Sequence, residues 1–349
     1  MKNEINIDGR PVGPNHPPYV LAEVSANHNG SLERALQTID AAKASGADGA
    51  KIQTYTPDTM TIDCDKEDFQ IRGGLWDGYN LYELYRWAQT PFEWHKAMFE
   101  HARSIDFTLF STPFDETAVD LLEDLNTPAY KVASFELIDL PLIRYIAATK
   151  KPMIMSTGMA NLEEIEEAVA AARDGGCTEL IVLHCISAYP APIEQANLHT
   201  IGDLAQRFDV MTGLSDHTLG TLAPVVATTL GACFIEKHFT LSRADKGPDS
   251  DFSIEPAELT QLRQDTIAAW ESLGKPGYSM KAAEKGNSNF RRSLYFVRDL
   301  APGEVIGPEH VRRIRPGFGL KPKHYDAVIG KSVVDAVTRG TAVQWDLLK

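Results

Sequence analysis

The amino-acid sequence predicts an α/β protein: a (β/α)8 barrel, or TIM barrel, followed by a small β-rich domain. Two observations predict the barrel. Eight short apolar runs recur over about 250 residues, and charge-studded amphipathic stretches separate most of them. Near-continuous apolar strands that alternate with helices are typical of a parallel sheet covered by helices. Eight such units fit a closed barrel better than an open sheet.

The predicted strands are runs rich in apolar and β-branched residues. In chain order they are 19–24, 50–54, 107–110, 129–133, 153–155, 180–185, 210–214 and 233–235. Two of the helices are expected at 31–45 and 161–174, where apolar residues recur at spacings of three and four, with Asn161 as the N-cap of the second. No Gly-x-Gly-x-x-Gly sequence opens the first unit, which argues against dinucleotide binding.

Polar residues stand at or just beyond the end of every predicted strand. They are Glu23, Lys51, Gln53, Ser111, Thr112, Lys131, Ser134, Glu136, Ser156, Ser187, Tyr189, Ser215, His217, Glu236 and His238. In a (β/α)8 barrel the carboxyl ends of the strands form the active-site face. One hydroxyl at such a position often only caps the next helix. Polar groups at all eight ends predict a shared active site.

Two histidines in this ring suggest a catalytic metal. His217 lies in Ser-Asp-His-Thr and His238 in Glu-Lys-His-Phe, each just past an apolar run. A lone histidine is more often a satisfied core or loop residue. Two imidazoles from neighbouring strands make half of a metal site, whose open positions would take water or substrate oxygens.

Lys51 and Lys131 are expected to point into the barrel, where an unpaired ammonium group is costly to desolvate. Surrounded by hydroxyls and helix N-termini, two such charges suit a phosphate group. One alternative pairs these lysines with glutamates (Glu23, Glu136 or Glu236) as internal salt bridges. Another makes one lysine the Schiff-base nucleophile of an aldolase.

The composition fits an enzyme of more than one domain. The 349 residues carry a formal net charge of −14 without a basic run, which argues against nucleic acid as a partner. No apolar run reaches the length of a membrane span, and no signal peptide precedes Tyr19, so no membrane association is expected. The four cysteines form no Cys-x-x-Cys pair, and Cys185 and Cys233 are expected to be buried thiols. This pattern predicts a cytoplasmic protein.

Two segments lie outside the barrel pattern. The aromatic-rich excursion 55–95 follows the second strand and is either a lid over the active site or a small satellite core. From 275 the chain changes character. We expect a catalytic domain at 1–274, a linker at 275–289, and a β-rich domain at 290–349 with strands near 293–297, 311–314, 332–337 and 342–343.

Taken together, these motifs resemble the sialic acid synthase family over nearly the whole chain. The matching segments are Glu23 with 25–30, then 51–53, 131–136, 156–159, 184–185, 189–190, 213–218, 236–239 and 247–249. The C-terminal part, including 312–317, resembles the antifreeze-like (SAF, β-clip) domain of that family. Segments 73–79, 111–117, 241–245 and 291–295 look most like the branch that makes pseudaminic acid, although Lys246 stands where a second glycine is expected.

The resemblance implies condensation of phosphoenolpyruvate (PEP) with an open-chain amino-sugar aldehyde, releasing phosphate by C–O cleavage. For this branch the sugar is 2,4-diacetamido-2,4,6-trideoxy-altropyranose. The implied cofactor is a divalent metal on His217 and His238, Mn²⁺ or Mg²⁺, with Co²⁺ and Zn²⁺ as alternatives.

The resemblance also implies roles for the other site residues. Glu136 and Glu23 would act in catalysis, Glu23 at the sugar end, and Gln53, Tyr189 and Asp249 would contact the sugar or PEP. The phosphate would be held by Lys51, Lys131, Thr112, Ser134, Ser156, Ser187 and Ser215.

In this family the small domain crosses to the partner of a domain-swapped homodimer, where Arg315 would reach an acetamido group of the sugar. Three other functions remain open from the sequence. These are N-acetylneuraminate or legionaminate synthesis, a Schiff-base aldolase, and a non-catalytic carbohydrate- or ice-binding protein.

Overall fold

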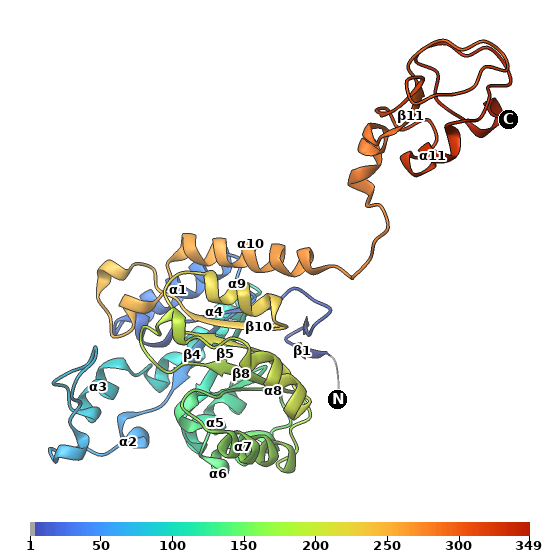
Figure 1. The fold of residues 1–349 in the computed structure, drawn as a ribbon. Helices are drawn as coiled ribbons and strands as arrows, with labels where there is room; N and C mark the ends of the chain where they lie inside the picture. The colour runs from blue at the N-terminus through green and yellow to red at the C-terminus, as the bar shows by residue number, and fades with distance from the viewer. Residues whose placement is uncertain (1–3) are drawn as a thin grey trace. The chain divides into compact units, whose positions relative to one another are not determined.

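The structure is a computed structural model that describes residues 4–349. The chain divides into two compact units, one ending at Gly274 and the other spanning Lys275–Lys349 (Figure 1). Among the described residues, no helix is both long and apolar enough to cross a membrane.

The first unit is a closed barrel of eight parallel strands in the order β10-β3-β4-β5-β6-β7-β8-β9. The strands are β3 (Tyr19–Glu23), β4 (Gly49–Thr54), β5 (Thr108–Pro113), β6 (Tyr130–Val132), β7 (Met153–Ser156), β8 (Leu180–Cys185), β9 (Met211–Asp216) and β10 (Phe234–His238). This arrangement confirms the predicted (β/α)8 fold.

Four strands extend further at their carboxyl ends than predicted. β5 runs to Pro113 rather than 110 and β7 to Ser156 rather than 155. β9 runs to Asp216 rather than 214, and β10 runs to His238 rather than 235. The ladder continues through polar rungs, with Glu236 opposite Ser215 and Lys237 opposite Asp216. The apolar pattern alone placed the ends of these strands too early. Most of the residues beyond the predicted ends are polar, and a polar residue can continue a buried strand when its polar groups find hydrogen-bond or ion-pair partners.

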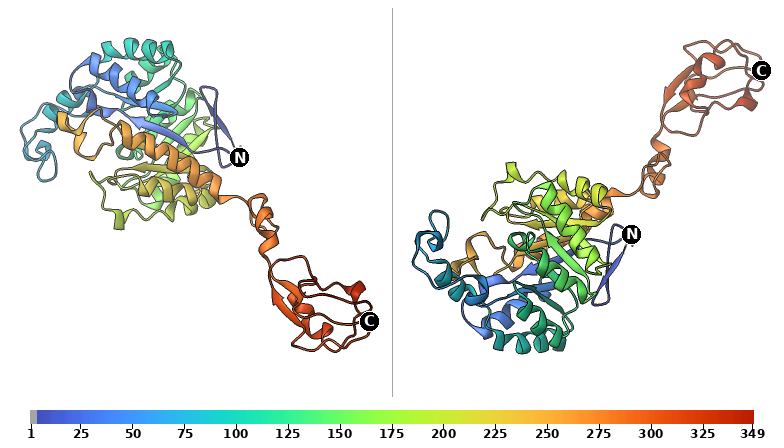
Figure 2. Two further views of the ribbon diagram at one scale, coloured as in Figure 1. Left: turned by 90° about the horizontal axis from the view of Figure 1, so that it is seen from above. Right: turned by 90° about the horizontal axis from the view of Figure 1, so that it is seen from below.

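Helices cover the outside of the barrel (Figure 2). They are α1 (Leu32–Ala44), α4 (Phe92–Ser104), α5 (Glu116–Asp124), α6 (Leu140–Ala148), α7 (Leu162–Asp174), α8 (Thr200–Phe208), α9 (Leu222–Thr229) and α10 (Pro256–Leu273). The two helices predicted from periodicity are α1 and α7. Asn161 caps α7 as expected, because its side chain accepts a hydrogen bond from the Glu164 N–H.

The amino-terminal end of the barrel is filled with apolar side chains. Inside it, Phe110, Ile154 and Phe234 belong to one buried cluster. A hairpin that the sequence pattern did not predict, β1 (Ile5–Ile7) and β2 (Arg10–Val12), adds Ile5, Ile7 and Val12 to the same cluster. Because apolar side chains close the amino-terminal end of the barrel, the polar strand ends at the carboxyl side are the part of the barrel interior that can form a site.

The excursion between β4 and β5 contains two short helices, α2 (Pro57–Met60) and α3 (Leu81–Ala88). Its aromatic residues pack partly on one another: the Tyr55 ring meets Tyr85 and Phe114 edge-on, with centroids 5.8 and 5.1 Å away. The excursion therefore has some aromatic packing of its own, and it also lines a cavity.

The second unit has a small core of its own around Leu294, Phe296 and Val333. It contains the antiparallel pair β11 (Ser293–Phe296) and β12 (Val311–Ile314), and the helix α11 (Tyr325–Val328). The strands expected at 332–337 and 342–343 are reduced to isolated bridges, since turns interrupt the pairing after each one. Part of the expected linker is ordered too, because Ala282–Phe290 forms 3-10 turns.

Candidate active site

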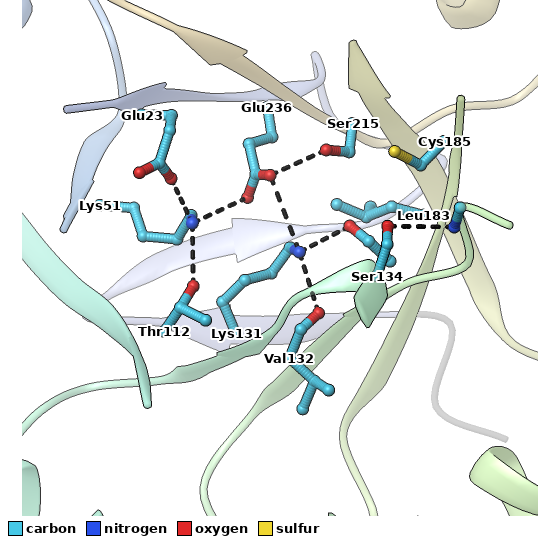
Figure 3. A network of polar contacts seen from close by, with 12 residues as sticks. Glu23, Lys51, Thr112, Lys131, Val132, Ser134, Leu183, Cys185, Ser215 and Glu236 are labelled. Atoms are coloured by element: carbon cyan, nitrogen blue, oxygen red, sulfur yellow. Dashed lines mark hydrogen bonds and ion pairs between the residues drawn. The ribbon is translucent and has the colours of Figure 1, made fainter. Parts of the chain in front are cut away.

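Four charged side chains meet inside the carboxyl end of the barrel (Figure 3). Lys51 forms an ion pair with Glu23, and its Nζ lies 3.9 Å from Oε2 of Glu236. The Nζ of Lys131 lies 3.7 Å from Oε1 of Glu236. All four residues are at most 6% exposed. The two lysines point inward as predicted, and the internal pairing weighed as an alternative is present, although Glu136 is not one of the partners.

Hydroxyl groups from neighbouring strands surround this network. Lys51 Nζ donates to Thr112 Oγ1 at 2.9 Å, and Lys131 Nζ donates to Ser156 Oγ at 2.6 Å. Ser215 Oγ donates to Oε1 of Glu236 at 2.9 Å. The predicted hydroxyls and lysines are therefore joined in one site.

Three loops approach one another closely beside the network. The Gly158 N–H donates to Ser134 Oγ at 3.0 Å. A Cβ at position 158 would lie 2.1 Å from Ser187 Oγ and 2.8 Å from Ser134 Oγ. Only glycine fits here, and its absent side chain lets both predicted serines lie side by side.

The charges shift one another's proton affinities. Burial would raise the pKa of Glu236, but Lys131 and Lys51 outweigh burial and lower it. Burial would lower the pKa of Lys51, and its carboxylate neighbours, Glu23 first, reverse that effect. Burial lowers the pKa of Lys131. Burial also raises the pKa of Glu23 to about 7, against the opposing effect of Lys51.

The two predicted metal ligands lie together. His217 directly follows β9 and His238 ends β10, with ring centroids 5.4 Å apart. The Nδ1–H of His217 donates to the Ile186 carbonyl at 2.9 Å, which leaves Nε2 as the nitrogen able to bind a cation. The buried Nδ1 of His238 has no hydrogen-bond partner.

These observations fit a cation held by two imidazoles. Burial and then His217 keep the pKa of His238 well below its ordinary value, so this ring is neutral. Burial would lower the pKa of His217, but the adjacent Cys185 outweighs burial, and the pKa of His217 is raised. A bound cation would displace the proton from the imidazole nitrogen that it occupies. Within residues 4–349, no group of three or more His, Cys, Asp or Glu side chains is placed so that it could hold a metal ion by itself.

A cavity of about 420 Å³ opens beside these residues. Its polar lining includes Gln53, Glu136, Tyr189, His238 and Asp249, all predicted from the sequence. Burial, opposed chiefly by Lys131, raises the pKa of Glu136 to about 7, and one of its carboxylate oxygens is buried without a hydrogen-bond partner. The volume of the cavity lies in the usual range for small-molecule sites.

Three of these residues are held by the loops around the cavity. Gln53 Nε2 donates to Ser25 Oγ at 2.9 Å. Asp249 accepts from the Ala26 N–H at 3.3 Å. The ring of Tyr189 lies 4.3 Å from that of His217, measured between centroids.

Arg315 is the one predicted site residue outside this unit; it is exposed on the second unit. Glu236, which was predicted as a polar strand end and as one possible partner of the lysines, joins both of them. Sequence reasoning gave no role to some other members. These members are Ser25, Gly158 and Cys185, whose residue types alone do not indicate a catalytic or binding role. Ser25, with a φ of 43°, begins the polar loop that follows β3.

The fold and the site together define a (β/α)8-barrel protein with two buried lysines and a histidine pair at the carboxyl end of its strands. The NeuB family model matches residues 38–278, and the SAF domain model matches residues 291–349. The chain belongs to the NeuB family and ends in a SAF domain, which confirms the predicted resemblance.

Two curated relatives come from one strain of Campylobacter jejuni. Its pseudaminic acid synthase is 44% identical, with 93% of this chain and 95% of the relative covered. Its N,N'-diacetyllegionaminic acid synthase is 35% identical, with 89% and 94% covered. Among solved structures, the N-acetylneuraminic acid synthetase of Leptospira borgpetersenii superposes with a TM-score of 0.73 at 29% identity, covering 81% of this chain and 94% of that chain.

Proposed function

We propose that the chain is a pseudaminic acid synthase, a transferase that condenses PEP and water with 2,4-diacetamido-2,4,6-trideoxy-β-L-altropyranose to give pseudaminate and phosphate. One observation carries the choice of sugar. Of two enzymes from the same bacterial strain, the chain is 44% identical to the pseudaminic acid synthase and 35% identical to the diacetyllegionaminic acid synthase. The buried lysines and the histidine pair supply groups that this reaction needs.

The four-charge network would bind PEP. Lys51 and Lys131 are buried cations, and the hydroxyls of Thr112 and Ser156 already point at them. A phosphate and a carboxylate bring further negative charge, which two lysines and neutral donors can accommodate. We assign the phosphate to the complete set inferred from the family: Lys51, Lys131, Thr112, Ser134, Ser156, Ser187 and Ser215.

His217 and His238 would hold a divalent cation, Mn²⁺ or Mg²⁺, since two imidazoles leave room for hard oxygen ligands. When bound, the cation would polarise the aldehyde oxygen of the open-chain sugar so that C3 of PEP can attack its carbon.

The carboxylates then act on the second carbon of PEP. Attack leaves positive charge at C2, and Glu136 would offset that charge and direct water to it. Glu23, Gln53, Tyr189 and Asp249 would orient the sugar and the enol. Collapse of the hydrated carbon expels phosphate with its bridging oxygen.

Product analysis tests this function directly. The purified chain, supplied with Mn²⁺, PEP and a panel of amino sugars, should yield pseudaminate identified by mass spectrometry and NMR. PEP labelled with ¹⁸O at the bridging oxygen should deliver that label to phosphate. Label retained in the sugar product would mean that water attacks phosphorus, and would exclude this mechanism.

Other family products are the main alternatives. Preferred turnover of N-acetylmannosamine would make the chain an N-acetylneuraminate synthase, and preferred turnover of the sugar precursor of legionaminate would make it a legionaminate synthase. Trapping of a pyruvate adduct by borohydride on Lys51 or Lys131 would indicate an aldolase. Absence of turnover with every sugar would favour a carbohydrate- or ice-binding role.

We also propose that two chains form a domain-swapped homodimer in which Arg315 completes the partner's site. Charge supports such docking. Residues 275–349 carry 14 Lys and Arg against 7 Asp and Glu, although the whole chain has a net charge of −14, so the barrel unit is strongly acidic. Opposite charge of this size favours association. The predicted cytoplasmic location stays a prediction.

A further inference from the structure

The cavity has two walls of different chemistry. One comes from the ends of barrel strands and the loops after them, and carries the polar groups described above. The other comes mostly from the excursion and is apolar. Its members are Tyr55, Met60, Ile71, Trp76, Leu81, Leu84, Tyr85 and Ala88, joined by Phe114.

Helix α3 supplies the apolar wall with one continuous stripe. Leu81, Leu84, Tyr85 and Ala88 are spaced like the buried face of an amphipathic helix. Such a stripe normally packs against a core. Here all four residues line the cavity, and only Leu84 is fully buried. An apolar helix face that is turned to an open cavity is a surface for a ligand rather than a core.

Trp76 of the apolar wall contacts residues on the polar side of the cavity. The indole Nε1 of Trp76 donates to the Pro248 carbonyl at 3.2 Å, beside Asp249. The ring of Trp76 also lies 5.8 Å from that of Tyr189, between centroids. The apolar wall is therefore positioned opposite the groups that would handle the aldehyde.

We propose that this wall selects sugars that are deoxygenated at C6 and N-acylated, by binding their methyl groups. The inference rests on the proposed function. The aldehyde must reach the cation site at His238 on the polar wall, so the far end of the sugar meets α3. A methyl group there is removed from water, whereas a hydroxyl would lose its hydrogen bonds to water and find aliphatic side chains instead.

The test compares two sugars that differ by one oxygen: the 2,4-diacetamido-2,4,6-trideoxy-altrose and its 6-hydroxy analogue. The unmodified enzyme should prefer the 6-deoxy sugar in kcat/KM by about 10- to 100-fold, the range for apolar pockets. Leu81→Gln places an amide of similar size on the wall and should reduce this preference by about fivefold or more, leaving the KM for PEP within about twofold.

Leu75→Gln is the matched control, because Leu75 lies in the same excursion, is 45% exposed and does not line the cavity. Met60→Gln on α2 is a second wall variant in case Leu81→Gln fails to fold. Equal turnover of both sugars, or wall variants that change the preference no more than Leu75→Gln does, would overturn the inference while leaving the synthase function intact. Failure of the unmodified enzyme to join PEP to any sugar would instead refute the proposed function.

Discussion

Asp216 and Lys237 form a buried ion pair on adjacent strands, with Oδ2 and Nζ 2.5 Å apart and neither residue more than 3% exposed. The same ammonium group donates to the Thr218 carbonyl at 2.5 Å, and the Thr218 N–H donates to Asp216 at 3.0 Å. The pair therefore joins the turn that carries His217 to the residue that precedes His238. We expect this link to fix the spacing of the two imidazoles.

Removing one partner of this pair should destabilise the barrel. Asp216→Asn or Lys237→Met leaves the other group buried without its counter-charge, which costs about 3–5 kcal/mol. Asp203→Asn, which breaks an exposed pair with Arg207, should change stability by less than about 1 kcal/mol. Denaturant unfolding measures both changes. A small effect at position 216 would show that water reaches the pair.

Replacing both partners separates stability from positioning. Asp216→Leu combined with Lys237→Met should recover most of the stability, because an apolar pair needs no desolvation of charge. The double variant should still bind Mn²⁺ about 10- to 100-fold more weakly, since the His217 turn loses its cross-link. Isothermal titration checks this. Undiminished affinity would mean that the pair supports only the fold.

Loss of either proposed metal ligand should abolish turnover and cation binding together. His217→Ala and His238→Ala each remove one of two imidazoles, so Mn²⁺ binding measured by electron paramagnetic resonance should fall by more than tenfold. His184→Gln is the control: this buried histidine bonds the Ala196 carbonyl at 2.7 Å and lies outside the site. Full activity after thorough chelation would contradict the metal assignment.

Glu136 should make stability and activity depend on pH in opposite directions. Burial raises its folded-state pKa to about 7 from an ordinary 4.5, so the folded protein holds the proton more tightly than the unfolded chain does. This contribution to stability is complete below pH 4.5 and is lost as the pH rises through about 7.

Glu136→Gln replaces the titrating carboxyl group with a neutral amide, so the variant should not lose this stability as the pH rises through about 7. Above pH 7 the variant should be more stable than the unmodified protein, by up to about 3 kcal/mol, and the difference should vanish near pH 4. Its kcat should fall about 10²- to 10⁴-fold. In the unmodified enzyme, kcat/KM should rise with pH through about 7 as the carboxylate forms. A stability difference that is independent of pH would show that Glu136 is solvated.

Arg315 allows a test of the swapped dimer. An Arg315→Ala chain and a His217→Ala chain, each impaired alone, should form mixed dimers that contain one intact site. After subunit exchange, activity should recover to about a quarter to half of normal. Lack of recovery, with exchange demonstrated by native mass spectrometry, would mean that each small domain serves its own barrel.

The sequence by itself determined which side chains could meet. Strand periodicity placed Lys51 and Lys131 inside the barrel and His217 and His238 at its carboxyl end, because alternation and the direction of parallel strands are local properties of the chain. The SAF-like strands past 330 were over-predicted, since β-propensity cannot show whether a partner strand lies beside them.

Only the tertiary structure decided how those groups are partnered. Closure of the barrel sets β10 against β3 and so brings Glu236 between two lysines. The stripe of α3 faces a cavity, although its periodicity is that of an ordinary core helix. Helical and strand patterns record burial on one face but not what lies opposite, and that depends on contacts between segments far apart in the chain.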